Sequence, residues 1–202
     1  SSYVLIVLGG KPAQLRESLK YLLINVISSA LFVMTVAFLY GIIGSLSMAD
    51  ISQKITEVGQ PAILNVIALL FLIVFGLKGA IFPLYFWLPG SYQVPPTPVL
   101  ALFGALLTKV GVYGILRTYS LFFSNEIGTI HQILSVLALS TIIIGVIGAL
   151  ATRDAKQIII YNIIVAVGVI LYGVSLMTPQ ALEGAIFYLL HDMVIKAALF
   201  LL

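Results

Sequence analysis

Residues 71–117 constrain the fold more than any other part of this sequence. They read FLIVFGLKGAIFPLYFWLPGSYQVPPTPVLALFGALLTKVGVYGILR, two apolar runs joined by a proline-rich connection. Each run holds one lysine, Lys78 in the first and Lys109 in the second. A charge in the middle of a membrane-spanning helix costs roughly 3 kcal/mol on insertion scales, so it persists where it faces protein or water. The stretch therefore predicts two membrane spans beside an ion pathway.

The composition of the chain also indicates a membrane protein. Of its 202 residues, 61% are apolar and only 8% are charged, and the mean hydropathy is +1.19. A soluble domain carries about 25% charged residues, which excludes that class. The chain has no cysteine, so thiolate metal sites and iron–sulfur clusters within it are excluded, and nothing indicates another metal or a cofactor. The net charge of +3 is too small to indicate a nucleic-acid partner.

Six apolar runs approach or exceed the length of about 20 residues that a helix needs to cross a bilayer. The expected spans cover residues 20–45, 61–88, 98–122, 132–151, 158–176 and 184–202. Residues 1–9 are too short to cross and read as the end of a partial span. We therefore predict an all-α, polytopic transmembrane helix bundle, with one transmembrane domain over residues 1–202. Both ends lie in apolar runs, so we expect a fragment of a longer protein.

A proline interrupts the third run. Residues 61–88 would form a helix of about 42 Å, longer than a bilayer core of about 30 Å. Pro83 lacks a backbone donor and clashes with the carbonyl four residues earlier. We expect a kink or unwound turn around residues 78–83, beside Lys78, and broken helices recur at the ion sites of transporters. The alternative is a kinked packing helix whose lysine reaches toward the interface.

The segment 89–98, PGSYQVPPTP, holds four prolines and no charge. Consecutive prolines exclude a helix interior, so we predict a rigid loop. Tyr85, Trp87 and Tyr92 lie at its edge, and tryptophan and tyrosine are enriched where a membrane meets water. We interpret these three residues as interface anchors.

The last segment places three ionisable side chains among aliphatic ones. It reads GAIFYLLHDMVIKAALFLL and contains His191, Asp192 and Lys196. Asp192 and Lys196 are four residues apart, so they share a helix face and can pair, while His191 lies about 100° round the helix. Histidine titrates near neutral pH, and intramembrane rows of such groups mark proton relays. The alternative is a structural ion pair with a bystander histidine.

Charges in the loops predict the orientation. One set of loops carries five basic residues and the other set carries two. The five are Lys11, Arg16, Lys20, Arg153 and Lys156, and the two are Lys54 and Arg117. Because cytoplasmic loops carry the excess of lysine and arginine, we expect loops 10–20, 89–98 and 152–157 to face the cytoplasm.

Four stretches resemble a known family. They are GLKGAIFPLYFWLPGSY, PPTPVLALFGALLTKVGVYGILR, ATRDAKQIIIYNIIVAVGVILYG and IFYLLHDMVIKAALFLL. They are similar to the antiporter-like membrane subunits, which are the proton-conducting subunits of respiratory complex I and their relatives in Mrp-type multisubunit sodium/proton antiporters. The run SYVLIVLGGKPAQLRESLKYLLINVISSALFV is similar to the D subunits of the Mrp branch. The resemblance covers nearly the whole chain.

The resemblance implies a longer parent built from inverted repeats. Lys78 would match the channel lysine of its discontinuous helix, with Pro83 supporting the break. Lys109 would match the connecting lysine of the next helix. Lys196, with His191 and Asp192 beside it, would match the central group of the second half. The glutamate that pairs with the channel lysine in family members has no match here, because Glu17 is expected in a loop, and the second broken helix would lie beyond the chain.

The function implied is proton translocation along Lys78, Lys109, His191 and Lys196, coupled to sodium exchange in a multisubunit antiporter. Two alternatives are an antiporter-like proton-pumping subunit of an NADH-quinone oxidoreductase or related hydrogenase complex, and a non-conducting membrane scaffold. The expected partners are other membrane subunits, protons, Na+ and the lipid bilayer. The expected location is the bacterial inner membrane, and the expected class is a secondary transporter subunit without covalent chemistry of its own.

Overall fold

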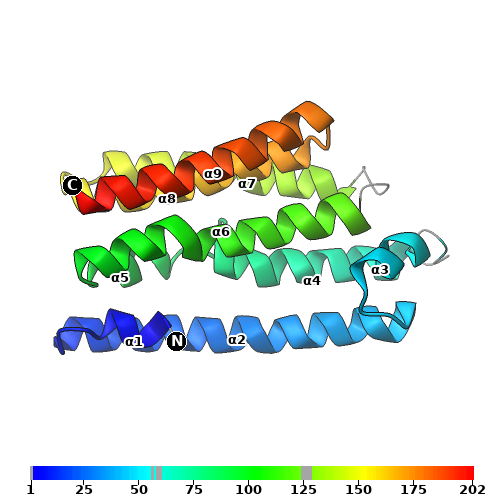
Figure 1. Ribbon diagram of the computed structural model, residues 1–202, viewed down its shortest axis with the longest axis horizontal. Helices are drawn as coiled ribbons and strands as arrows, with labels where there is room; N and C mark the ends of the chain where they lie inside the picture. The colour runs from blue at the N-terminus through cyan, green and yellow to red at the C-terminus, as the bar shows by residue number, and fades with distance from the viewer. Residues whose placement is uncertain (1, 56, 58–60, 124–128) are drawn as a thin grey trace.

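The helices of this protein run side by side along one common direction (Figure 1). The structure is a computed structural model, and it describes residues 2–55, 57, 61–123 and 129–202. The helices in these ranges are α1 (Ser2–Ile6), α2 (Pro12–Ile43), α3 (Met48–Lys54), α4 (Pro61–Gly79), α5 (Leu88–Gln93), α6 (Thr97–Phe122), α7 (Thr129–Leu150), α8 (Ala155–Ser175) and α9 (Pro179–Leu201). No strand occurs in the described ranges.

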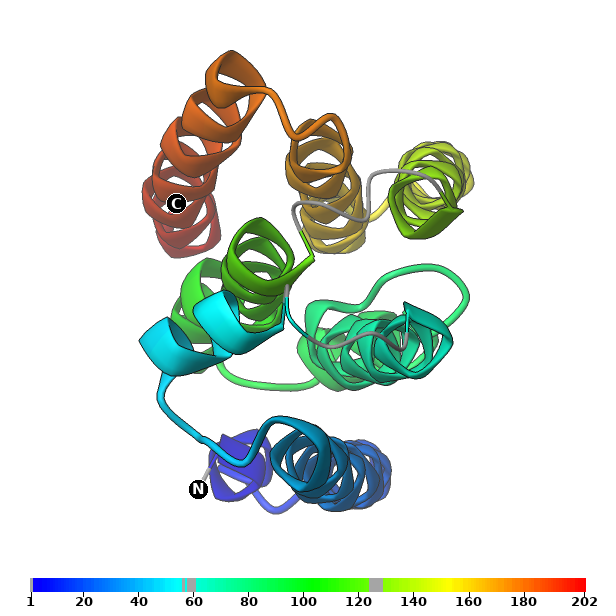
Figure 2. The same cartoon turned by 90° about the vertical axis from the view of Figure 1, so that its right-hand side faces the viewer.

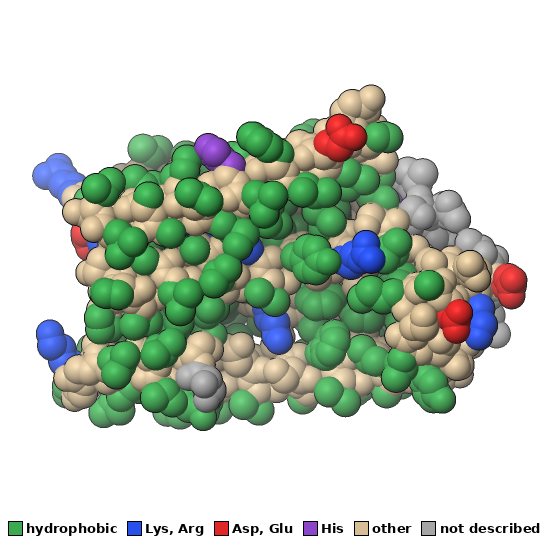
Figure 3. All heavy atoms as spheres, viewed as in Figure 1, with side chains coloured by type: hydrophobic (Ala, Val, Ile, Leu, Met, Phe, Trp, Pro, Cys, Tyr) green, Lys and Arg blue, Asp and Glu red, His purple; other side chains and the backbone are tan. Residues whose placement is uncertain are grey.

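Six of the described helices are long and apolar enough to cross a membrane, namely α2, α4, α6, α7, α8 and α9. Mostly hydrophobic side chains cover the length of the face shown in Figure 3, and several charged ones gather toward its two ends. The short α1 corresponds to the predicted partial span. The prediction of an all-α, polytopic transmembrane bundle is confirmed.

The central helix of the bundle is α6. Viewed along the helices, α2 lies at one edge, α4 and α6 form the middle, and α7, α8 and α9 form the opposite layer (Figure 2). Helix α6 contacts α4, α8 and α9, whereas α2 contacts α4 and α7 contacts mainly α8. More than half of the α6 residues are buried, including its lysine, Lys109. A polar group on the buried side of α6, such as Lys109, is therefore shielded by neighbouring helices.

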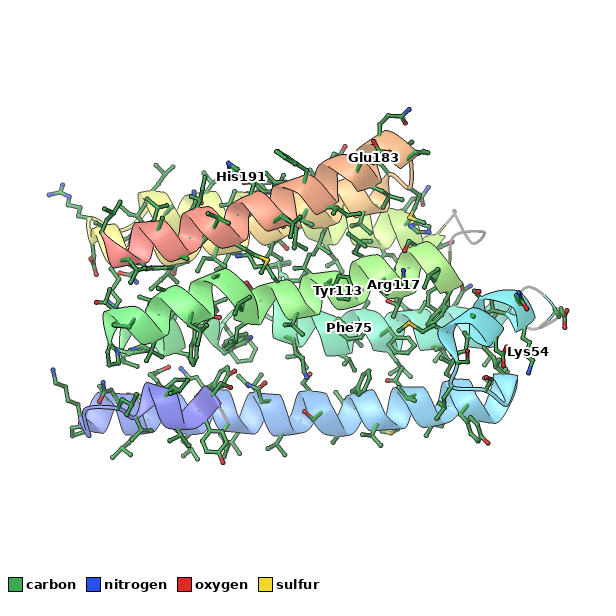
Figure 4. The ribbon with its side chains drawn as sticks, viewed as in Figure 1. Lys54, Phe75, Tyr113, Arg117, Glu183 and His191 are labelled. Carbon is green, nitrogen blue, oxygen red and sulfur yellow. The ribbon has the colours of Figure 1, made fainter. Side chains whose placement is uncertain are left out.

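Three segments predicted to lie on one side of the membrane meet at one end of the bundle. The Lys156 amine donates to the carbonyls of Gln93 and Pro95, at 2.7 and 3.3 Å. The Gln14 amide donates to the Val94 carbonyl at 3.0 Å. These bonds join the start of α2, the end of α5 and the start of α8. Lys54 and Arg117 lie toward the opposite end (Figure 4).

Two predicted loops are largely helical. Residues 10–20 were expected as a loop, but α2 begins at Pro12, because proline suits the first helical turn and the Lys11 amide is capped by the Gln14 side chain at 3.1 Å. Glu17 consequently lies on a helix, not in a loop. Within 89–98, α5 occupies residues up to Gln93, and only the following prolines end it.

The remaining boundaries depart little from expectation. The short helix α3 lies between the first two long spans, outside every predicted span.

Candidate ion-transfer site in the bundle

The third predicted span breaks where the sequence indicated. Helix α4 ends at Gly79 and α5 starts at Leu88, so the segment between them is non-helical. Ala80 has a φ of +59°, and the Ile81 amide donates to the Gly76 carbonyl at 3.1 Å, the bond that closes a helix through a left-handed residue. Pro83 follows in a cis peptide bond. The break is confirmed and is longer than the predicted 78–83, since helix resumes only after Trp87.

Side chains from two places satisfy backbone groups that the break exposes. The Trp87 indole donates to the Leu77 carbonyl at 2.9 Å. The Phe82 amide donates to the Thr141 hydroxyl of α7 at 3.0 Å, and that hydroxyl donates to the Leu137 carbonyl at 2.6 Å. Backbone groups at membrane depth need such partners. Hydrogen bonds from within the bundle therefore stabilise the break.

The interpretation of Trp87 and Tyr92 as interface anchors is wrong. Both are buried, and with Tyr21 and Phe103 they form an aromatic cluster with ring centroids 5.5–6.3 Å apart. The Tyr92 hydroxyl donates to the Phe103 carbonyl at 3.2 Å. The amphipathic rings that suit an interface also suit an interior where the polar tip finds a partner. Tyr85 is half-buried beside this cluster.

Lys78 lies in a cavity of about 180 Å³ between α2, α4 and α6. The lining residues are Tyr21, Ile24, Asn25, Ser28, Leu77, Lys78, Trp87, Leu106, Leu107 and Val110. The side chain of Lys78 is half-buried, and among the described residues its amine forms no ion pair. The cavity carries polar groups from Asn25 and Ser28, and the Ser28 hydroxyl donates to the Val74 carbonyl at 3.1 Å.

Lys109, Asp192 and Lys196 form a buried ion cluster between α6 and α9. The Lys109 amine lies 2.6 Å from one carboxylate oxygen of Asp192, and the Lys196 amine lies 3.2 Å from the other. All three residues are only 3% exposed. The Lys109 amine also donates to the Gly104 carbonyl at 3.0 Å, and the Lys196 amine donates to the side-chain carbonyl of Asn162 on α8.

The predicted pairing of Asp192 with Lys196 is confirmed, and the contact of Asp192 with Lys109 was not predicted. That contact joins residues 83 positions apart, so spacing along one helix gives no signal for it. Sequence reasoning does not identify Asn162 as a site residue either. Its only signal is a polar amide near the start of an otherwise apolar span.

The cluster holds two ammonium groups and one carboxylate, a net charge of +1 when both lysines are protonated. Two unit charges 4 Å apart interact by about 4 kcal/mol at an effective dielectric constant of 20. A change of charge on one lysine is therefore felt by the other. Release of one proton leaves a neutral cluster in which the carboxylate still has a partner.

His191 does not join this cluster. It lies on the outer side of α9, exposed, with its ring stacked on Phe187 and Tyr188 at centroid distances of 6.3 and 6.1 Å (Figure 4). Lys78 is separate as well, since it lies in its own cavity. The structure thus brings together Lys109, Asp192 and Lys196, and leaves Lys78 and His191 on either side of them.

The backbones of α4 and α6 touch between the two lysine sites. A Cβ atom placed on Gly111 would lie 2.4 Å from the Gly79 nitrogen and 2.7 Å from the Phe75 carbonyl oxygen. A second cavity, of about 220 Å³, lies beside Lys109, and its lining shares Leu106 and Val110 with the cavity of Lys78. These two side chains are 40% and 62% exposed, so both cavities open beside them on the outer face of α6.

Comparisons with known proteins identify the family of the chain. The family described as NADH:quinone oxidoreductase/Mrp antiporter, TM matches residues 1–202. The chain is 59% identical to the D subunit of the Na(+)/H(+) antiporter of Bacillus subtilis (strain 168), and 52% identical to the subunit of the same name from Alkalihalophilus pseudofirmus. In each case the match covers the whole of this chain and 41% of the relative.

Two solved structures share the fold. One, of the Mrp complex from Dietzia sp. DQ12-45-1b, has a chain with a TM-score of 0.91 and 31% identity, over 99% of this chain and 38% of that one. The other is the membrane-bound sulfane sulfur reductase, an archaeal respiratory membrane complex, with a TM-score of 0.89 and 27% identity, over 99% of this chain and 41% of that one. The break, the buried lysines and these matches have one explanation: the chain belongs to the NADH:quinone oxidoreductase/Mrp antiporter transmembrane family.

Proposed function

We propose that this chain is the proton-translocating part of a subunit in a multisubunit Na+/H+ antiporter. The observation that carries the proposal is the Lys109–Asp192–Lys196 cluster, two buried lysines that share one carboxylate. Ionisable groups inside a membrane bundle are rare and mark ion pathways. The 59% identity to the D subunit of an Na(+)/H(+) antiporter supports the choice of complex.

In the proposed path, protons pass from Lys78 to Lys109, then to Lys196 and on to His191. The first step would pass Leu106 and Val110 of α6, which line both the cavity of Lys78 and the cavity beside Lys109. A proton arriving at Lys109 raises the charge of the cluster and favours release from Lys196, because the two ammonium groups repel one another. Asp192 holds whichever lysine stays charged. His191 would receive the proton on the outer side of α9.

The partners we propose are other membrane subunits, protons and Na+, in a bacterial inner membrane. Multisubunit complexes among the structural relatives support the subunit partners. Five of the seven basic residues used for orientation fall in segments at the end of the bundle where α5 lies, which favours the cytoplasm for that end. In this role the chain makes and breaks no covalent bond except to protons, so it is a transporter subunit rather than an enzyme.

The test uses the complete subunit within its complex, in everted vesicles with a pH-sensitive dye. Sodium is added, and proton movement is followed in the wild type, Lys78→Ala and Lys109→Ala, with assembly checked on a native gel. We expect flux in the wild type and its loss in both variants with assembly intact. Flux that survives both substitutions overturns the relay and leaves the lysines as scaffold.

The second candidate is a proton-pumping subunit of a respiratory complex. The likeness to the archaeal respiratory membrane complex favours it, since the fold match is nearly as close as for the Mrp complex. The same vesicles separate the two functions. Proton pumping that follows addition of an electron donor, without any response to sodium, would replace the antiporter with the respiratory complex.

A further inference from the structure

Two side-chain hydrogen bonds hold the helix break, one buried and one partly buried, and the buried one comes from Trp87. Leu77 is the residue before Lys78, and its carbonyl faces a stretch with no following helical turn to supply a donor. The Trp87 indole supplies that donor at 2.9 Å, from within the same broken segment. Trp87 is 3% exposed and lines the cavity that holds Lys78.

Thr141 provides the second bond, from a different helix. Its hydroxyl accepts from the Phe82 amide at 3.0 Å and donates to the Leu137 carbonyl at 2.6 Å, so both its hydrogen-bonding roles are used. Thr141 is fully buried. Helix α7 carries no acidic residue, lysine or arginine. The Thr141 hydroxyl links this helix to the break by a hydrogen bond.

Together the two bonds fix both arms of the break. Trp87 ties the far end of the segment back to the last turn of α4, and its ring is wedged against Tyr21 at a centroid distance of 5.5 Å. Thr141 fixes the middle of the segment to α7. The last turn of α4 carries Lys78, so a shift of the break would move the backbone from which this side chain enters the cavity.

We infer that Trp87 and Thr141 are positioning residues that hold the helix break, and with it the amine of Lys78, in the geometry for proton transfer. The inference rests on the proposed function and adds two residues that act through Lys78 without touching the proton. Loss of either bond leaves a backbone group of the break without its partner, which opens the segment to water or to a second conformation.

Conservative variants isolate the bonds. Trp87→Phe keeps an aromatic ring and removes the N–H. Thr141→Val keeps the shape and removes the hydroxyl, and Thr141→Ser restores it. The matched control is Tyr119→Phe, which removes a buried donor to the Ala68 carbonyl of the same helix α4, at 2.8 Å, in a regular turn far from the break.

In sodium-driven vesicle assays of the assembled complex, we expect Trp87→Phe and Thr141→Val to lower the maximal proton flux roughly tenfold. One polar group left without its hydrogen-bond partner changes an equilibrium by about that factor. We expect the pH dependence of the rate to shift and the apparent KM for sodium to stay unchanged. Thr141→Ser and Tyr119→Phe should behave as wild type. Equal losses in Tyr119→Phe, or unchanged flux and pH profile in both break variants, would overturn the inference.

A second measurement does not depend on sodium exchange. Hydrogen–deuterium exchange of the purified complex should quicken in peptides covering residues 81–84 in Thr141→Val, since the Phe82 amide loses its acceptor, and should stay slow there in Tyr119→Phe. If the wild type shows no sodium-driven flux, the antiporter proposal fails while this readout still decides whether Thr141 holds the break. Unchanged exchange in Thr141→Val contradicts the positioning role.

Discussion

Lys78 and Lys109 are both lysines at membrane depth, but their surroundings are opposite. Lys109 lies on a continuous helix, is 3% exposed and has a carboxylate at 2.6 Å. Lys78 is the next-to-last residue of the helix that ends at the break, is half-buried in a cavity, and has no ion pair within the described residues. Lys109 is fixed by an ion pair, whereas the position of Lys78 depends on the last turn of α4 and on the break that follows it.

The difference separates two ways to keep a charge inside a membrane. A paired lysine is stabilised by its counter-ion, so removing the counter-ion disturbs the fold. A lysine beside a cavity, with no ion pair among the described residues, can be stabilised by water and by freed backbone dipoles, so removing it should disturb function more than stability. Substitutions at the two sites should therefore affect proton flux and thermal stability to different degrees.

Asp192→Asn should have the largest effect, since it leaves the amines of Lys109 and Lys196 without their carboxylate. Breaking a buried ion pair costs about 3–5 kcal/mol, so we expect lower thermal stability of the complex and loss of proton flux. Fluorescence-detected size exclusion after heating measures the first, and the vesicle assay measures the second. The control is Glu183→Gln, an exposed acid on the same helix (Figure 4). If Asp192→Asn and Glu183→Gln show the same thermal stability and the same flux, the proposed role of the ion cluster is refuted.

Lys78→Met should abolish flux and cost less stability than Asp192→Asn. The apolar side chain can occupy the space of the lysine stem, and no carboxylate in the described chain is left without its partner. The thermal midpoint of the complex should therefore stay above that of Asp192→Asn. A midpoint as low as that of Asp192→Asn would show that Lys78 has an ion-pair partner elsewhere in the complete subunit.

Gly111→Ala should give an intermediate effect, because it acts on the contact between the two sites. The added Cβ meets backbone atoms of Gly79 and Phe75 at 2.4 and 2.7 Å, so α4 and α6 must separate. We expect the stability to fall by about 1–3 kcal/mol and the proton flux to be reduced. Gly41→Ala on α2 meets no atom within 4 Å and serves as the control. Normal flux and stability in Gly111→Ala would show that the helices tolerate separation.

His191→Ala should have the smallest effect. The side chain is exposed on the outer side of α9, away from the ion cluster, and substitutions at such positions change stability by about 0.5 kcal/mol or less. His191 is the last group of the proposed path and is exposed, so another acceptor can take the proton there. We expect assembly as in the wild type and a smaller loss of flux than in Lys109→Ala, measured in the same vesicles. A loss equal to that of Lys109→Ala would place His191 among the obligatory groups.

Local patterns in the sequence predicted the elements that depend on local chemistry. Run length predicted the six spans, Pro83 predicted the break, and the four-residue spacing predicted the pair of Asp192 with Lys196. Contacts between distant segments were not predictable in this way. The partnership of Lys109 with Asp192 depends on how α6 and α9 pack, and that packing follows from the whole bundle.

Two further errors have specific physical causes. The interface interpretation of Trp87 depends on its residue type, which is common there, while its real environment is set by a carbonyl that the break leaves without a donor. The expectation of a loop at 10–20 depends on its charges, yet charged side chains on the outer turns of a long helix reach water without ending the helix.

The arrangement of the ion cluster bears on how its charges find their partners. Asp192 and Lys196 are one helical turn apart, so α9 brings a buried cation together with its counter-ion on the same helix. Helix α6 has no acidic residue, so its buried Lys109 pairs only with the Asp192 that follows 83 residues later in the chain. Lys109 therefore lacks its carboxylate until α9 docks against α6, and that docking supplies the counter-ion.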